Sequence, residues 1–353
     1  MDRRTFLSTA FVSTVLPNRV LAASSCLAGG QSLDDKLLAW LMLDGGPDLR
    51  HMIVPEYDSV FDSVGNAYWR HRNRAHEISN NNSAWQNKWQ NDFFHHPNPT
   101  GGEFGILDQA GWLNSMYAAG NVAFVCNAVG SKSRNHSLST RIMDQGNLDS
   151  GGNDIARSGW GGRLASVAGG NCVSLTSNPR QFCFGLHPSG DINLFDKSNL
   201  IGLENSRNAG LYEYTSSNYK TDRRSQLERG LTAWYGGKRS QIPASSPLFR
   251  VMESERKLRE FGEKIDDVLA LCPIPDEIRA LYTANVLPNQ PNRLLGRSSF
   301  GRQIRNLWDA IVVNKDLSMR TCSLDYGGWD SHSNQKNGIE DNIRDIWGVD
   351  GGF

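Results

Sequence analysis

Short, continuous hydrophobic runs recur along the chain, and segments with hydrophobic residues at helical spacing lie between them. The first run, residues 36–44 (KLLAWLMLD), ends in Gly-Gly-Pro and predicts a buried parallel strand followed by a loop. Later segments predict further strands: NVAFVCNAV at 121–129, CVSLT and FCFG between 172 and 185, and SMRTCSLD at 318–325.

Helices are expected between these strands. They are expected within 111–120, 138–145, 156–170, 246–272, 300–314 and 339–347, and Pro273 ends the longest of them. Because strands and helices alternate, we predict an α/β protein with a mostly parallel sheet that carries helices on both faces.

One segment departs from this alternation. Residues 56–105 are polar and predict an irregular insertion, with helix around Trp69–His76 and Ala84–Phe94. The histidines of this segment are His71, His76, His95 and His96. We interpret them as solvated surface side chains rather than metal ligands. Residues 26–353 otherwise form a single predicted domain, without repeats or an interdomain linker.

The first 25 residues have the layout of an export signal. Arg3 and Arg4 precede Thr5-Phe6-Leu7, a modest hydrophobic stretch follows, and Val20-Leu21-Ala22 is a cleavage site of the small-residue type. Paired arginines followed by Phe and Leu are typical of the twin-arginine pathway. We therefore predict a twin-arginine signal peptide at residues 1–25, the twin-arginine translocase as a partner, and the periplasm or cell envelope as the destination. The alternative is a basic start to an ordinary surface helix.

Composition excludes several classes of protein. The 353 residues include 37 Lys plus Arg and 37 Asp plus Glu, so no net charge attracts the chain to nucleic acid or an anionic membrane. No hydrophobic run approaches the roughly 20 residues that a transmembrane helix needs. The cysteines after the signal lie too far apart for a zinc-ligand pattern. A Cys172–Cys183 disulfide would be one outcome, but we expect buried thiols.

Two carboxylates follow the first predicted strand. Asp44 ends the run at 36–44, and Asp48 comes shortly after it in a glycine loop. In open α/β sheets ligands bind at the carboxyl ends of the strands, where carboxylates can hold a divalent cation. Asp44 and Asp48 would serve equally well as caps of the turn and of the helix after it. Spacing alone leaves both interpretations open.

A second candidate, GGWDSHSNQ, follows the last predicted strand. Asp330 and His332 are two residues apart, so in an extended segment their side chains point to the same side. A carboxylate and an imidazole that face one point suit zinc or manganese better than calcium. Most Asp-x-His pairs are structural, so the position directly after a strand is what supports the metal interpretation.

The third candidate is the loop SKSRNHS, which leads from a predicted strand into a helix N-terminus, where free amides attract anions. Ser133 or Ser137 would be a nucleophile, Arg134 a contact to an oxyanion or phosphate, and His136 a ligand or acid–base group. For any single serine, capping the helix is the simpler interpretation.

Four segments resemble, in order, the motifs of the domain of unknown function 1501 family: GGPDLRHMIVP, the Arg-x-His-Ser loop ending in Gly146, SGWGGRL and GGWDSHSNQ. The resemblance covers nearly the whole chain after the signal, and a twin-arginine start is usual in that family. It implies a fold similar to alkaline phosphatases, sulfatases and phosphoglycerate mutases, with a metal site near strand ends. Asp48, Asp330 and His332 fall on the matching positions, and His136 falls on the family's Ser-His-Phe motif.

Two departures change what this resemblance implies. The motif's serine is Asn135 here, whose amide is no nucleophile, and the family's Phe-Gly-Arg stretch and Asp-His-Gly pair do not follow His332. We therefore expect an alkaline-phosphatase-like domain that is truncated at its C-terminus, lacks half of the metal shell and is inactive on phosphate or sulfate model esters.

The predicted function is that of a metal-dependent, hydrolase-like protein of the cell envelope that acts on a phosphate or sulfate ester of unknown identity. The expected cofactor is a divalent metal, zinc or manganese rather than calcium. The alternative is a non-catalytic exported protein that keeps the fold for binding or assembly.

Overall fold

The computed structural model of this chain describes residues 36–125, 130–131, 135–147, 154–204, 299–330, 335–349 and 351, with scattered positions between 230 and 253. Within these residues the chain is an α/β protein with a parallel sheet and helices, as predicted. The expected signal peptide and most of the helix expected at 246–272 lie outside the described residues. None of the described helices combines the length and the hydrophobicity that crossing a membrane requires.

The central sheet has four strands in the order β1-β9-β5-β8, and every neighbouring pair is parallel. Its strands are β1 (Leu38–Leu43), β9 (Met319–Tyr326), β5 (Asn171–Ser174) and β8 (Leu200–Gly202). Strand β1 pairs with β9 over its full length, from Leu38 opposite Thr321 to Leu43 opposite Tyr326. The two strands therefore end side by side at the carboxyl edge of the sheet.

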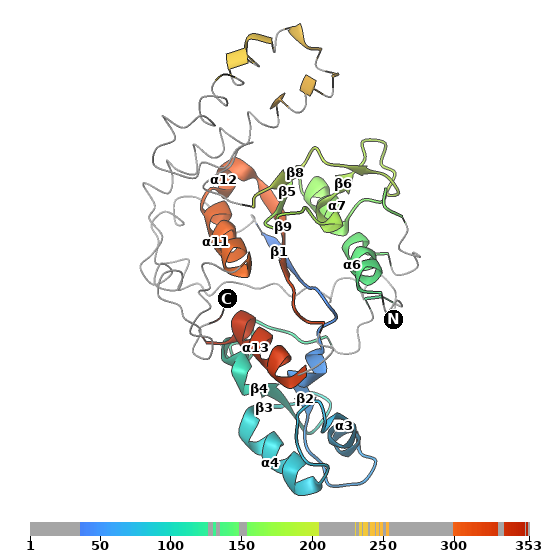
Figure 1. Ribbon diagram of the computed structural model, residues 1–353, viewed down its shortest axis with the longest axis vertical. Helices are drawn as coiled ribbons and strands as arrows, with labels where there is room; N and C mark the ends of the chain where they lie inside the picture. The colour runs from blue at the N-terminus through green and yellow to red at the C-terminus, as the bar shows by residue number, and fades with distance from the viewer. Residues whose placement is uncertain are drawn as a thin grey trace.

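Helices cover both faces of this sheet (Figure 1). On one face, α11 (Ser299–Val312) packs against strand residues that include Val173. On the other face, α7 (Trp160–Val167) and the short 3-10 helix η3 (Gln181–Cys183) lie against β5, where Cys172 is fully buried. Consecutive residues of β5 thus point to opposite hydrophobic layers, as expected for a strand that is covered on both sides.

Three further elements complete this part of the molecule. They are α6 (His136–Gln145), α12 (Asn314–Leu317) and an antiparallel ribbon of β6 (Gly185–Leu186) and β7 (Phe195–Asp196). Helices α6, α7 and α11 match segments in which the hydrophobic spacing predicted helix. The cysteines in the described part, Cys172, Cys183 and Cys322, are buried free thiols, as expected.

The expected irregular insertion is instead a folded unit, here called the lobe (residues 53–107). An antiparallel sheet in the order β2-β4-β3 packs against two helices at one end of the molecule (Figure 1). The elements of the lobe are β2 (Ile53–Pro55), α3 (Val64–Arg72), α4 (Asn82–Asp92), β3 (Phe93–Pro97) and β4 (Glu103–Leu107). Trp69, Trp85 and Trp89 are buried among them and supply the core that the polar composition concealed.

Helix α13 (Gln335–Trp347) joins the lobe to the central sheet. Its buried Ile339, Ile343 and Ile346 recur at helical spacing and share one hydrophobic cluster with Trp69 of the lobe. The same cluster includes residues of η2 (Asp108–Ala110) and α5 (Gly111–Ala118). Because α13 follows β9 in the chain, the carboxyl end of β9 lies where the central sheet meets the lobe.

The strand expected at 121–129 is not present over 121–125, the part of it that the structure describes. Val125 is 49% exposed, while Val122 and Phe124 pack against the core of the lobe. Phe124 stacks on Tyr117 with 5.3 Å between ring centroids. Packing on neighbouring aromatic rings therefore replaces the expected sheet pairing over these residues.

Candidate functional site

The carboxyl ends of β1 and β9 build the candidate site. The backbone N–H of Asp44 donates to the carbonyl of Tyr326 (2.9 Å), and the N–H of Trp329 donates to the carbonyl of Asp44 (3.3 Å). These bonds hold Asp330, the residue after Trp329, next to the loop that follows β1. Parallel α/β sheets bind their ligands at this edge.

Two glycines allow this close approach. Gly45 has a φ of +111°, and a Cβ placed on it would lie 2.5 Å from the backbone nitrogen of Asp330. Gly46 has a φ of +77°, and its Cβ would lie 3.2 Å from Cε1 of His136. Both backbone conformations favour glycine; a Cβ on Gly45 would clash with the backbone of Asp330, and one on Gly46 would press against the ring of His136. The glycine loop is therefore a contact surface for Asp330 and His136.

His136 and Asp330 face each other across this loop. His136 Nε2 lies 3.6 Å from Asp330 Oδ1, and the two side chains are 52% and 46% exposed. His136 is the first residue of α6, whose N-cap is Asn135; the side chain of Asn135 accepts a hydrogen bond from the N–H of Leu138 (3.1 Å). The structure thus brings together two residues that the sequence singled out in separate motifs.

Asp44, the third predicted residue at this edge, pairs with an arginine that the sequence analysis missed. Arg180 Nη1 donates to Asp44 Oδ2 (2.9 Å), while Arg180 Nη2 lies 3.4 Å from Asp144 Oδ2. Arg180 Nε lies 3.4 Å from the other oxygen of Asp144, so the guanidinium faces both oxygens of that carboxylate. The Arg180 side chain is only 8% exposed. Its guanidinium therefore bridges the end of β1 to helix α6.

The glycines of SGWGGRL explain how Arg180 is positioned. A Cβ on Gly159 would overlap the carbonyl oxygen of Gln181, and one on Gly161 would overlap the ring of Phe182. A Cβ on Gly162 would overlap the backbone of Phe184. The start of α7 can therefore lie directly against η3, whose N-cap is Arg180. The SGWGGRL motif therefore has a packing role, and it affects the site by positioning η3 and the adjacent Arg180.

Burial and pairing shift the ionisation of this group of residues. Burial, and secondarily the nearby charge of Asp44, raise the pKa of Asp144 to about 6, although Arg180 opposes the shift. For Arg180 burial lowers the pKa, but Asp144 and Asp44 outweigh it and the net shift is upward. Arg180 therefore stays charged, and its charge compensates the carboxylates on either side of it.

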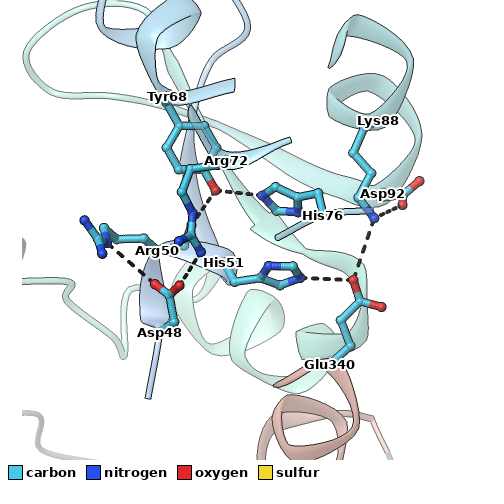
Figure 2. Close-up of polar contacts among 9 residues, drawn as sticks. All are labelled: Asp48, Arg50, His51, Tyr68, Arg72, His76, Lys88, Asp92 and Glu340. Carbon is cyan, nitrogen blue, oxygen red and sulfur yellow. Dashed lines mark hydrogen bonds and ion pairs between the residues drawn. The ribbon is translucent and has the colours of Figure 1, made fainter. Parts of the chain in front are cut away.

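Asp48, in contrast, lies in a separate polar cluster between the lobe and α13 (Figure 2). One oxygen of its carboxylate pairs with Arg72 of α3, and the other lies 3.5 Å from Nε of Arg50. Arg50 belongs to η1 (Leu49–His51), the turn that links the site loop to β2. Asp48 thus pairs with two cations here; it is the N-cap residue of η1, but its side chain makes no capping hydrogen bond.

The same cluster buries two histidines. His51 and His76 stack with 4.2 Å between ring centroids, and both are fully buried. His51 Nε2 lies 3.1 Å from Glu340 Oε1 of α13, and His76 Nε2 lies 2.8 Å from the hydroxyl of Tyr68. The expectation that His76 is a solvated surface residue is wrong, because the folded lobe and α13 enclose it.

Burial dominates the ionisation of this cluster. It lowers the pKa of His76 to about 2, with His51, Lys88, Arg72 and Lys336 adding to the shift, and it raises the pKa of Tyr68. Burial also acts to raise the pKa of Glu340, but the His51 hydrogen bond and the charge of Lys88 reverse the shift and leave the pKa lowered. Glu340 is therefore anionic in this interior, and His76 is neutral.

Of the remaining predicted residues, Ser137 is exposed in the first turn of α6, whereas Ser133, Arg134 and His332 lie outside the described residues. Among those that are described, no three His, Cys, Asp or Glu side chains are grouped as a metal site would require. The residues missed by the sequence analysis are Arg180 and Asp144. The signal that could have found Arg180 is the one used for Asp44, namely a charged residue in the loop after a sheet strand, here β5.

Comparison of this chain with protein-family models, with curated proteins and with solved structures found no match. The resemblance to the domain of unknown function 1501 family stays a prediction that rests on the four motifs.

Proposed function

We propose that the carboxyl edge of the parallel sheet binds one divalent cation through His136 and Asp330, in an exported protein that is hydrolase-like toward phosphate or sulfate esters. The observation that carries this proposal is the approach of His136 to Asp330 across the glycine loop, 3.6 Å between Nε2 and Oδ1. Both side chains are half exposed, so an ion and a substrate can reach them from solvent.

The donor set fits a borderline cation. An imidazole nitrogen and a carboxylate oxygen are the ligands that zinc and manganese accept together, whereas calcium prefers oxygen alone. His332, two residues beyond Asp330 in the sequence, is the predicted third ligand and lies outside the described residues. Arg180 already neutralises Asp44, so we assign the ion to the His136 side of the loop.

The chemistry would follow from this placement. A divalent cation polarises an ester oxygen and stabilises the charge that develops on it. His136 would orient the ion from the start of α6, and Asp330 would supply the compensating negative charge from the loop after β9. Gly45 allows the close approach of Asp330, since a Cβ there would clash with the backbone of Asp330, and Gly46 leaves room for the ring of His136.

A specific observation favours the second candidate, a non-catalytic binding protein. Asn135 occupies the position of the family's serine, and its side chain caps α6 by accepting a hydrogen bond from Leu138 N–H. A residue that caps a helix through an amide oxygen offers no nucleophile. Metal binding without ester hydrolysis would support this candidate.

Metal titration tests the proposal directly. The full chain, freed of metal with a chelator, is titrated with Zn²⁺ and separately with Mn²⁺ by isothermal calorimetry. We expect binding to the wild type, and a loss of about tenfold or more in affinity for each of the variants His136→Ala and Asp330→Asn. His187→Ala is the matched control, because His187 is only partly buried and its side chain bonds locally, to Ser189. A wild type that binds neither ion would refute the proposal.

Export is tested separately. We propose that Arg3 and Arg4 direct the chain to the twin-arginine translocase and hence to the periplasm or cell envelope. Replacing both residues with lysine should leave the precursor in the cytoplasm, as measured by cell fractionation. Unchanged export of the double variant would contradict this proposal.

A further inference from the structure

We propose that Arg180 limits this edge of the sheet to a single divalent cation, because its guanidinium occupies the position between Asp44 and Asp144 that a second cation would need. The inference rests on the proposed function, since it concerns the number of ions that the same edge binds. Arg180 is thereby a specificity-determining residue, and its guanidinium pairs with Asp44 and Asp144 rather than forming part of the His136–Asp330 pair.

The geometry of the guanidinium is that of a bound cation. Its Nη1 lies 2.9 Å from Asp44 Oδ2, and its Nη2 and Nε each lie 3.4 Å from an oxygen of Asp144. Two carboxylates from different elements, the end of β1 and helix α6, thus converge on one positive group. Carboxylate oxygens that converge in this way are the usual ligands of divalent cations.

The charges of Asp44 and Asp144 explain why a positive group lies between them. The side chain of Asp144 is 4% exposed and that of Arg180 8%, so water screens their interaction poorly. Without the guanidinium, two carboxylates would face one point, and at least one of them would be protonated or would recruit a cation. Arginine supplies this cation from within the chain.

Packing of η3 also fixes the backbone next to Arg180. Gly161 allows α7 to touch the ring of Phe182, and this ring stacks on Trp40 of β1 with 5.8 Å between centroids. Phe182 belongs to η3, which begins directly after Arg180. The backbone next to Arg180 is therefore wedged between α7 and the sheet, so that an incoming ion does not displace the guanidinium easily.

Metal stoichiometry tests the inference. The full-length wild type and its variants are dialysed to equilibrium against Mn²⁺, and bound metal per chain is measured by elemental analysis. We expect one ion in the wild type and in Arg180→Lys, which keeps the charge, and two in Arg180→Met. The double variant Arg180→Met/Asp144→Asn removes one of the two carboxylates and should return to one ion.

The outcomes separate this inference from the proposed function. If the wild type binds no ion but Arg180→Met binds one, the His136–Asp330 site is wrong and the role of Arg180 stands. If the wild type binds one ion and folded Arg180→Met also binds only one, the role of Arg180 is overturned.

Folding of the variant is a second readout. Removing the guanidinium leaves the buried carboxylate of Asp144 uncompensated, so Arg180→Met is expected to melt at a lower temperature, and Mn²⁺ should raise its melting temperature more than that of the wild type. A variant that remains unfolded at saturating Mn²⁺ would contradict the inference, because the ion is expected to replace the missing charge.

Discussion

The carboxyl edge of the sheet and the polar cluster between the lobe and α13 each contain a histidine next to a carboxylate and an arginine next to an aspartate. The pairs are His136–Asp330 and Arg180–Asp44 at the edge, and His51–Glu340 and Arg72–Asp48 in the cluster. The two histidine pairs differ in exposure: at the edge both side chains are about half exposed, whereas His51 is 0% and Glu340 11% exposed. The histidine–carboxylate pair is therefore open to solvent at the edge and closed to it in the cluster.

This difference in exposure assigns different roles to similar pairs. Separating a half-exposed ion pair costs little free energy, so a metal ion can insert between its two members. A buried pair is costly to break, because the group that is left behind keeps an uncompensated charge or an unsatisfied hydrogen bond. We therefore interpret the edge as a binding site and the buried cluster as the connection that fixes the lobe to α13.

Breaking the buried connection should have the largest effect. In Glu340→Ala, His51 loses its carboxylate partner and Lys88, whose Nζ lies 3.7 Å from Glu340, loses one of its two. We expect the free energy of unfolding to fall by about 3 kcal/mol, as measured by urea denaturation. Glu103→Ala is the control, since Glu103 faces His95 at 3.9 Å on the surface and should cost less than about 1 kcal/mol. Equal losses in the two variants would contradict the comparison.

Acid should weaken the buried cluster. The pKa of His76 is lowered to about 2, while a histidine in the unfolded chain titrates near 6.5, so this contribution to stability is complete above pH 6.5. Below that pH the unfolded chain takes up a proton that the folded chain refuses, and about 2 kcal/mol is lost between pH 6 and 4.5. Glu340, with its lowered pKa, adds a loss in the same direction at lower pH.

The stability contribution of Asp144, at the carboxyl edge, should change with pH in the opposite direction. The pKa of Asp144 is raised to about 6, so its contribution is complete below the unfolded value near 4 and is lost as the pH rises to 6. The free energy of unfolding is measured by urea denaturation from pH 4 to 7. In His76→Phe it should fall less than in the wild type as the pH is lowered, and in Asp144→Asn it should fall more. Identical pH profiles for the wild type and His76→Phe would show that His76 does not set the acid response.

Disturbing the packing that positions Arg180 should lower the free energy of unfolding by a smaller amount. A Cβ on Gly161 of α7 would lie 2.1 Å from Cζ of Phe182, whereas Gly338 of α13 has open space around it. Gly161→Ala should therefore lower the free energy of unfolding by about 1.5 kcal/mol, and Gly338→Ala should raise it by about 0.5–1 kcal/mol through helix propensity. Thermal melts of the two variants measure the difference. A stabilised Gly161→Ala variant would show that η3 is not wedged.

The same contrast shows what could be predicted from sequence. Strands β1 and β9 and helix α11 follow from local hydrophobic patterns, and Asp44 and Asp330 follow from their places just after strands. The fold of the lobe did not follow, because Trp69, Trp85 and Trp89 are widely spaced in a polar segment and share their core with α13, far along the chain. The bridge from Arg180 to Asp44 joins loops after different strands, a juxtaposition that depends on the sheet order β1-β9-β5 rather than on any local pattern.

The smallest expected effect comes from the helix caps, which occur in both regions. Asn135 caps α6 at the edge, and Asn81 caps α4 in the lobe by accepting from Ala84 N–H at 2.8 Å. If Asn135 acts only as a cap, Asn135→Ala and Asn81→Ala should each lower the free energy of unfolding by about 1 kcal/mol. Asn135→Ser should cost only a few tenths, because a serine hydroxyl also accepts from the first turn of a helix. Thermal melts measure all three variants.

The serine variant also tests the two candidate functions against each other, because it restores the hydroxyl that the family motif carries. Asn135→Ser and the wild type are assayed on phosphate and sulfate model esters with Mn²⁺ or Zn²⁺ present. A non-catalytic binding protein should leave both esters intact in both proteins, since a cap at this position only orders α6. Hydrolysis by Asn135→Ser but not by the wild type would instead show that the edge retains the rest of a catalytic arrangement. Asparagine at position 135 would then be what separates binding from catalysis in this chain.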